Sequence, residues 1–365
     1  MVSSCIPWLQ ELVINNIRLM KEIDIYTNKD PLLIFKEDIE TKKRTVLFLG
    51  AGINNTVNRR LMWADLLDFL MDHAASRLNA SDEEREIITR AFKNKDNDET
   101  VENLKLKLKA SQTFSVEVKA SIIKQLLGEF YIPTLKRFIY GWDVRGLLWE
   151  GSQQYVVNPN VEDAPFHSLF SIADFILKHD NIKAVVTYNY DNYLSSAIKL
   201  LMDDDNYKQK NSRIIKPLDI YSGWKDKPIT DEAFLIYHVH GMVLPDDMVA
   251  PHCSNQVVLS MEEYYDMARD AYSWQSATQI NYLTHYTCAF IGASLSDMTM
   301  QRVLHYANLK QSGENVYYLS AKLPNDASAD AFQKLNNSYF KLLGMKVVYE
   351  TKGYGELYKQ LNSIN

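Results

Sequence analysis

Cysteine is scarce in this sequence, and the cysteines present do not form a pattern. The 365 residues include only Cys5, Cys253 and Cys288, with no two of them close together. An odd, scattered set excludes a disulfide framework and a four-cysteine zinc module, and it suits a reducing compartment. The sequence therefore predicts a cytoplasmic protein without structural disulfides.

Long apolar runs and an excess of positive charge are also missing. No run of about 18 apolar residues occurs, so no membrane span is predicted, and the N-terminus does not resemble a signal peptide. The net charge of -6 gives no strong indication of nucleic-acid binding. With 46% apolar and 24% charged residues, the composition is that of a globular protein. The length allows one large α/β domain with an added piece.

One stretch organises the rest of the chain. The apolar run Thr45–Leu49 leads directly into Gly50-Ala51-Gly52, and a helical pattern follows from about 63 to 78. A short apolar run bounded by glycines predicts a strand buried on both faces, over 45–50. A strand, a glycine turn and a helix can together hold a phosphate on backbone N–H groups. The alternative is a tight turn without any ligand.

Further strand patterns recur along the chain. They predict strands at 182–187, 234–239, 286–291, 316–320 and 345–349. Helical patterns follow most of them, which is typical of parallel βαβ units. The predicted fold is α/β, with a Rossmann-like parallel sheet and helices on both faces.

Two regions lie outside this alternation. Residues 79–180 carry helical patterns, so we expect a helical insertion between the first two strands. Residues 1–40 are predicted to form an N-terminal helical arm, in which Asp30-Pro31 starts a second short helix. The remaining 41–365 would be the Rossmann-like domain.

Chemically distinctive residues follow four of the predicted strands. In chain order these are Gly50-Ala51-Gly52, Thr187-Tyr188-Asn189-Tyr190-Asp191, His240-Gly241 and Gly292-Ala293-Ser294. Ligands of open α/β sheets bind beyond the carboxyl ends of the strands, where these residues are expected to meet.

These four elements, in this order, resemble the sirtuin-like family of NAD-binding proteins. The family has a Gly-Ala-Gly turn, a Thr-x-Asn-x-Asp element, a His-Gly and a Gly-x-Ser. The version Gly292…Leu295-Ser296-Asp297, and the helix pattern Trp63-x-x-Leu66-Leu67, look more like the bacterial anti-phage defence branch than like the protein deacylases. Members of that branch, such as the NADase effector of the Thoeris system, hydrolyse NAD.

The resemblance implies roles for individual residues. It implies that Asn189, Asp191 and His240 act in catalysis, with Asn189 beside the nicotinamide ribose and His240 as the general base. It implies that the bound NAD+ is contacted by Gly50, Ala51, Gly52, Asn54, Thr187, Gly241, Gly292 and Ser294. Sirtuins usually have serine where this chain has Asn54, so we expect altered phosphate contacts there.

Each of these assignments has a structural alternative. Asn189 and Asp191 could form an Asx turn that stabilises their loop, and His240 could be a core histidine. Asp297 is expected to be the N-cap of the next helix. The pairs Tyr264-Tyr265 and Tyr317-Tyr318 are expected to belong to the core.

Metal binding is not predicted. A zinc site could be drawn from His238, His240 and His252-Cys253, but their spacing matches no familiar zinc pattern. The deacylases carry a four-cysteine zinc module beside their acyl-lysine tunnel, and three scattered cysteines cannot form one.

The predicted function is hydrolysis of NAD+ to ADP-ribose and nicotinamide in anti-phage defence. The alternatives are an NAD-dependent protein deacylase and a non-catalytic sensor subunit that binds NAD or ADP-ribose. Because a toxic NADase must be restrained, we expect a homo-oligomer that is controlled by a separately encoded defence partner or a phage-derived activator.

Overall fold

The computed structural model describes most of the chain, and all structural statements below concern these residues. They are 30–55, 62–78, 114–141, 144–211, 213–221, 233–245, 257–270, 273–295, 297–308, 315–322 and 327–364.

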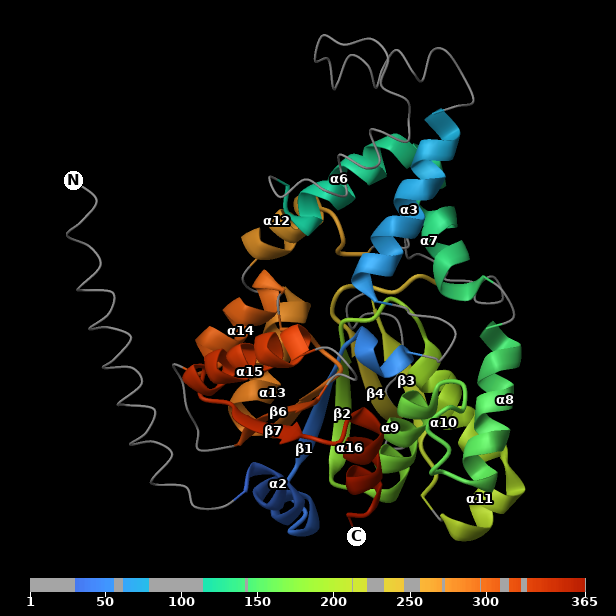
Figure 1. The fold of residues 1–365 in the computed structure, drawn as a ribbon, viewed down its shortest axis with the longest axis vertical. Helices are drawn as coiled ribbons and strands as arrows, with labels where there is room; N and C mark the ends of the chain where they lie inside the picture. The colour runs from blue at the N-terminus through green and yellow to red at the C-terminus, as the bar shows by residue number, and fades with distance from the viewer. Residues whose placement is uncertain are drawn as a thin grey trace, which may run out of the picture.

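A seven-stranded parallel sheet forms the centre of the protein (Figure 1). Its strands are β1 (Thr45–Leu49), β2 (Ile182–Thr187), β3 (Lys216–Ile220), β4 (Ala233–His238), β5 (Thr287–Ile291), β6 (Val316–Ala321) and β7 (Lys346–Glu350). The spatial order is β3-β4-β2-β1-β5-β6-β7, which places β1 between β2 and β5. The order reverses on either side of β1, and a doubly wound sheet binds ligands at such a point. The predicted Rossmann-like fold is confirmed.

Helices cover both faces of the sheet and the carboxyl ends of its strands (Figure 1). They are α2 (Pro31–Glu40), α3 (Trp63–Leu78), α6 (Val116–Leu127), α7 (Tyr131–Tyr140), α8 (Val144–Val157), α9 (His167–Lys178), α10 (Tyr193–Asp203), α11 (Asp205–Lys210), α12 (Met261–Arg269), α13 (Trp274–His285), α14 (Met298–Asn308), α15 (Ala327–Leu342) and α16 (Tyr354–Asn362). Short 3₁₀ helices span Ala51–Asn54 and Gly128–Phe130.

The alternation of side chains along β1 explains how both faces are buried. Val46 and Phe48 belong to an apolar cluster with α13, α14 and α15, whereas Leu47 and Leu49 belong to a second cluster with α2, α9, α10 and α16. Successive strand residues point to opposite faces, so a strand covered on both sides must be apolar throughout. All five residues of β1 are buried.

Four helices stand over the carboxyl ends of the strands rather than against a face of the sheet. Figure 1 shows α3, α6, α7 and α12 above this edge, and α6 contacts both α3 and α12. Two of them, α6 and α7, come from the predicted insertion, whereas α9 from the same region packs in the sheet's apolar cluster. The insertion therefore supplies both a cap over the sheet edge and a helix of one face.

The strand predictions hold with one omission, β3. Its sequence Lys-Pro-Leu-Asp-Ile carries a proline and two charged residues, so the apolar pattern is weak. The strand lies at the edge of the sheet and pairs only with β4, where a proline is tolerated because one side of the strand needs no ladder hydrogen bonds.

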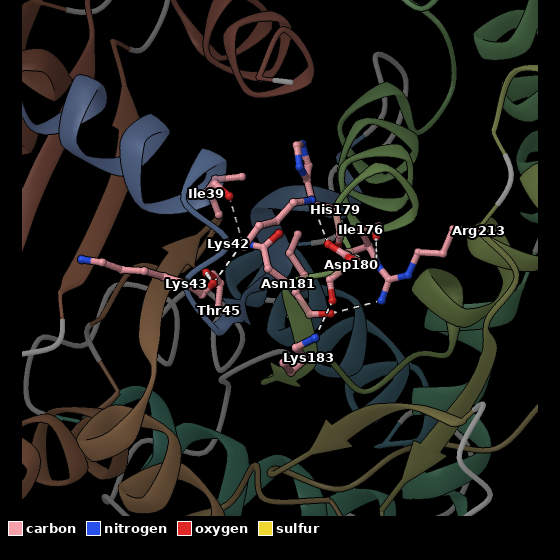
Figure 2. Close-up of polar contacts among 11 residues, drawn as sticks. Ile39, Lys42, Lys43, Thr45, Ile176, His179, Asp180, Asn181, Lys183 and Arg213 are labelled. Atoms are coloured by element: carbon pink, nitrogen blue, oxygen red, sulfur yellow. Dashed lines mark hydrogen bonds and ion pairs between the residues drawn. The ribbon is translucent and has the colours of Figure 1, made fainter.

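At the amino ends of β1 and β2, on the side of the sheet away from the cap helices, polar side chains donate hydrogen bonds to backbone carbonyls (Figure 2). Arg213 donates to the carbonyls of Ile176, His179 and Ile182, which satisfies the C-terminal end of α9 and the start of β2. The Asn181 amide donates to the carbonyl of Ile39 at 3.3 Å and to that of Lys43 at 2.9 Å, tying the end of α2 to β2. The donors of Arg213 and Asn181 are therefore engaged inside the protein.

Several other expectations have simple outcomes. The helix predicted after Asp30-Pro31 is α2, and the Asp30 side chain accepts from the Leu32 N–H as its cap. Residues 1–29, His252-Cys253 and Ser296 lie outside the described residues, so the expectations placed on them stay predictions. No helix within the described ranges is long and apolar enough to cross a bilayer.

Candidate functional site

A pocket of about 470 Å³ lies at the carboxyl ends of β1, β2, β4 and β5, under the cap helices α3, α6, α7 and α12. This size is within the range typical of small-molecule sites. It is lined by eight of the predicted site residues, namely Gly50, Ala51, Asn54, Asn189, Asp191, His240, Gly292 and Ser294. The predicted contacts Gly52, Thr187 and Gly241 lie behind this wall. The four motifs thus meet where the topology predicts, and the roles assigned to their residues stay predictions.

The glycines of the first turn are required by a neighbouring loop. A Cβ atom on Gly50 would lie 2.6 Å from the carbonyl oxygen of Gly292, and one on Gly52 would lie 2.9 Å from the Gly292 Cα. The Gly52 N–H donates to the Gly292 carbonyl at 2.9 Å. These glycines therefore allow the turns after β1 and β5 to pack together, and the Gly52 N–H is already engaged inside the protein.

The backbone conformation at position 241 also explains why a glycine follows His240. Gly241 has a φ of +80°, in the left-handed region that side chains disfavour. It forms an isolated antiparallel bridge with Val257, and the His240 carbonyl accepts from the Val258 N–H at 2.8 Å. The turn at Gly241 thereby ends β4 and holds His240 at the pocket wall.

Asn189 is held by groups from three strands. Its backbone N–H donates to the Thr187 hydroxyl at 3.1 Å, and its side-chain amide donates to the Gly50 carbonyl at 3.3 Å. Its backbone carbonyl lies 3.2 Å from Nδ1 of His238, whose Nε2 lies 2.9 Å from the Asp219 carboxylate on β3. Thr187 and His238 thus position the Asn189 loop from behind, although neither lines the pocket.

Asp191 pairs with Asn54 inside the pocket wall. The Asn54 amide donates to Asp191 Oδ2 at 2.7 Å, and the Tyr193 N–H donates to Oδ1 at 3.0 Å. The second bond is the Asx turn of the structural alternative, so Asp191 both caps its loop and lines the pocket. Burial raises the pKa of Asp191 to about 6, against the lowering effects of the Tyr193 N–H, the His238 charge and the Asn54 amide.

The Asn54 side chain is only half engaged inside the protein, and the expectation of altered phosphate contacts there stays a prediction. Its Nδ2 is engaged by Asp191, whereas its buried Oδ1 has no hydrogen-bond partner among the described residues. Buried acceptors in proteins are normally satisfied, so this oxygen points to a donor supplied by a ligand or by water. In this arrangement the side chain would accept a hydrogen bond from a ligand.

His240 is buried between two tyrosines. The Tyr188 and Tyr264 rings meet its imidazole edge-on, with centroids 5.1 Å and 5.7 Å away. Its Nε2 lies 3.4 Å from the Thr299 hydroxyl and 3.7 Å from the Asp297 carboxylate. Burial lowers the pKa of His240, and the charge of Asp297 offsets part of that effect. The imidazole is therefore neutral at neutral pH and able to accept a proton.

Asp297 is both the cap of a helix and a residue of the pocket, and the sequence predicted only the cap. It caps α14 as predicted, because its Oδ1 accepts from the Met300 N–H at 2.9 Å. It also lines the pocket, and its Oδ2 accepts from the Tyr264 hydroxyl. Burial favours the protonated carboxyl, but the His240 charge and the bonds from Thr299, Tyr264 and the Met300 N–H lower the pKa of Asp297 overall. An ionised carboxylate therefore stands beside His240.

The sequence missed several pocket residues. Tyr264 is buried as expected but also lines the pocket, whereas Tyr265, expected in the core, is exposed; Tyr317 and Tyr318 are buried core residues as predicted. The cap helices add apolar side chains that carry no motif, among them Val116, Phe138 and Ile139, whereas the lining residue Trp63 belongs to the Trp63-x-x-Leu66-Leu67 pattern of the sequence. Asp297 also offered a signal, because it stands three residues after Ser294 of the Gly-x-Ser element.

Metal binding was considered for the histidines near the pocket. In the ranges that the structure describes, no three His, Cys, Asp or Glu side chains are grouped to hold a metal ion. His238 is instead engaged by Asp219 and by the Asn189 carbonyl.

Comparison with known families supports the resemblance. Residues 183–341 match the family model described as the SIR2-like domain. The matched segment runs from β2 into α15 and contains Asn189, Asp191, His240 and Asp297, whereas the glycine turn after β1 precedes it. No curated protein matches the chain. The match covers less than half of the chain, and it agrees with the resemblance to the sirtuin-like family of NAD-binding proteins.

Proposed function

We propose that this SIR2-like chain is an NAD+ hydrolase that releases ADP-ribose and nicotinamide. The observation that carries the proposal is the meeting of Asn189, Asp191 and a neutral, buried His240 in one pocket beside the Gly50 turn. The unsatisfied Asn54 Oδ1 adds an acceptor in the same wall, suited to a hydroxyl or amide donor of the substrate.

The proposed chemistry uses a base and negative charge. A water oxygen attacks C1′ of the nicotinamide ribose, the bond between C1′ and the nicotinamide nitrogen breaks, and His240 takes the proton of the water. Nicotinamide leaves as a neutral molecule and needs little help from an acid. A positioned base of this kind typically contributes about 10²–10⁴-fold to the rate.

The carboxylates of the pocket fit the charge that develops. The ribose becomes oxocarbenium-like as the glycosidic bond lengthens, so negative groups nearby stabilise it. Asp297 is ionised, and Asp191, with a pKa of about 6, is mostly ionised at pH 7. Asn189, held by Thr187 and Gly50, would bind the ribose hydroxyls or the attacking water.

The experiment that tests this proposal measures NAD+ consumption by wild type, Asn189→Ala and His240→Ala. We expect turnover by wild type without any peptide, and a loss of at least about 10²-fold in His240→Ala. Product analysis should give free ADP-ribose and nicotinamide. Full turnover in both variants, or none in wild type under any activating condition, would overturn the proposal.

Two other activities would give different results in the same assay. A protein deacylase would consume NAD+ only with an acylated peptide and would form an acylated ADP-ribose product. A non-catalytic sensor would bind NAD+ or ADP-ribose without turnover. Adding acetylated peptide to one arm and measuring binding by calorimetry in another separates all three.

We further propose that NAD+ loss serves anti-phage defence and is held in check until infection. Regulation would come from homo-oligomerisation together with a separately encoded partner or a phage-derived activator. Cells that express the wild-type chain with its neighbouring genes should lose NAD+ after infection, whereas cells with His240→Ala should not. Unchanged NAD+ levels in infected wild-type cells would count against this role.

A further inference from the structure

The groups around Nε2 of His240 constrain where its proton lies. Thr299, at the second position of α14, donates its hydroxyl proton to Asp297 Oδ1. A hydroxyl has only one proton to give. The Thr299 oxygen, 3.4 Å from Nε2 of His240, is then available to the histidine only as an acceptor.

From this geometry we propose that Asp297 and Thr299 are positioning residues that fix His240 as the Nε2–H tautomer. In this tautomer Nδ1 carries the lone pair and is the atom that accepts the proton. Within the described residues, the hydrogen bond made by the His240 side chain engages Nε2. The role of Nδ1 as a base rests on the proposed function, whereas the tautomer itself does not.

The ring is held in this orientation from both sides. Tyr188, from the loop after β2, and Tyr264, from α12, contact the imidazole edge-on at interplanar angles of 75° and 83°. Tyr264 also donates its hydroxyl to Asp297 Oδ2, so the same residue fixes both the ring and the carboxylate. The titratable groups that face His240 are thus Asp297, Tyr188 and Tyr264.

The carboxylate also supports the charge that the base acquires. When a proton moves from a water or ribose hydroxyl oxygen to Nδ1, the O–H bond breaks, an N–H bond forms and the ring becomes positive. Asp297 Oδ2 lies 3.7 Å from Nε2, close enough to stabilise that positive charge in a water-poor site. The arrangement follows the logic of a histidine oriented by a carboxylate, with Thr299 completing the contact.

Capping of α14 does not explain this arrangement. The cap uses Asp297 Oδ1 and the Met300 N–H, whereas Oδ2 is turned toward Tyr264 and His240. The Asp297 side chain is 15% exposed and lines the pocket. A residue that served only as a cap would not need a buried tyrosine and a buried histidine at its second oxygen.

Three substitutions separate positioning from capping. Asp297→Asn keeps a good N-cap, because asparagine and aspartate are similar in that position, but it removes the charge. Thr299→Val keeps the shape of the side chain and removes the hydroxyl. Thr299→Ser restores the hydroxyl and is the rescue variant. Circular dichroism and thermal melting check that each variant is folded.

The first readout is independent of any activity. In protein labelled with ¹⁵N-histidine, the imidazole nitrogen shifts of His240, assigned by their loss in His240→Ala, report which nitrogen carries the proton. We expect Nε2–H in wild type and Thr299→Ser, and a mixture of tautomers in Thr299→Val. An Nδ1–H tautomer in wild type, or an unchanged tautomer in Thr299→Val, would overturn the proposal.

The second readout is the pH profile of kcat/KM for NAD+. Thr299→Val should lose about tenfold in kcat, less than removal of the base would cost, and Thr299→Ser should recover most of it. Asp297→Asn should lower kcat and move the part of the acidic limb that reports His240 to lower pH, because the neighbouring negative charge raises the pKa of His240, whereas the part that reports Asp191, with its pKa of about 6, should stay in place. An unmoved limb would contradict the role of Asp297. If wild type shows the Nε2–H tautomer but no NAD+ turnover, the positioning stands and the proposed hydrolysis fails.

Discussion

Two buried histidines lie at opposite ends of the strands of the same sheet, and their surroundings differ. His240 follows β4 at the carboxyl edge, and His179 precedes β2 at the amino edge. Both residues are nearly inaccessible, with exposed fractions of 3% and 2%, and burial lowers the pKa of both, that of His179 to about 4. Neither burial nor a lowered pKa therefore distinguishes a functional histidine from a structural one.

The charges around each ring make the distinction. His240 has the Asp297 carboxylate 3.7 Å from Nε2, so a proton arriving on the ring is stabilised. For His179, burial has the largest effect, and the cationic Lys42 and Lys178 lower its pKa further, whereas the charge of Asp174 offsets only part of that lowering. Its Nε2 is buried without a hydrogen-bond partner among the described residues. One ring is arranged to accept a proton, whereas the other is kept neutral.

The polar groups next to each histidine differ in the same way. At the amino ends of the strands, the side chains of Arg213 and Asn181 donate hydrogen bonds to backbone carbonyls (Figure 2). At the carboxyl edge, Asn189, Asn54 and Asp297 line a pocket. The comparison indicates that the amino edge of the sheet holds the fold together, and that the carboxyl edge is where chemistry can occur.

The largest expected effect comes from exchanging each histidine for alanine. His240→Ala should reduce NAD+ turnover per folded molecule by about 10²–10⁴-fold and should also lower the melting temperature, because the ring is buried against Tyr188 and Tyr264. His179→Ala should melt earlier, because it opens a cavity beside Phe175, but should keep its turnover per folded molecule. Turnover and thermal melting are measured on the same preparations. Equal losses of turnover, after correction for the folded fraction, would break the comparison.

Two of the buried asparagines, Asn181 and Asn189, extend the test with a smaller effect on stability. Asn181→Ala removes two hydrogen bonds to backbone carbonyls, one of them buried, and should lower the free energy of unfolding by about 1–3 kcal/mol without changing kcat. Asn189→Ala removes one side-chain bond of 3.3 Å and should cost less stability but most of the turnover. Urea unfolding and NAD+ consumption give the two values for each variant. A catalytic defect in Asn181→Ala would show that the two edges are coupled.

Much of this division could be predicted from sequence because it depends on local patterns. Each strand and the glycines or polar residues that follow it are neighbours in the chain, as at β1, β2 and β4. Because the sheet is parallel, the carboxyl ends of these strands lie together. β3 was missed because an edge strand tolerates Pro217 and Asp219.

The remaining features depend on contacts between distant segments. Gly50 and Gly52 must be small because Gly292 approaches them, and Asn54 is engaged by Asp191 from another strand end. Thr299 carries no motif, and its importance follows only from its place between Asp297 and His240. The cap helices add apolar side chains whose pattern is that of any amphipathic helix.

The smallest expected effect concerns the pH dependence of stability. The pKa of His179 is about 4 in the folded protein and near 6.5 in an unfolded chain. Between these values the unfolded state binds more protons, so the free energy of unfolding falls as the pH falls from 6.5 to 4 and changes little below that. We expect a contribution of about 1–2 kcal/mol, because the cationic neighbours Lys42 and Lys178 are partly exposed and screened by solvent.

His179→Leu tests this contribution, because leucine cannot titrate and its apolar side chain can pack against Phe175. Urea unfolding at pH 7.0, 5.5 and 4.5, compared with wild type, should show the variant gaining relative stability as the pH falls. The exposed His285→Gln is the matched control for loss of a histidine and should follow wild type at all three values. If His179→Leu keeps a constant difference from wild type across this range, His179 is not held neutral, and the contrast with His240 must rest on the pocket alone.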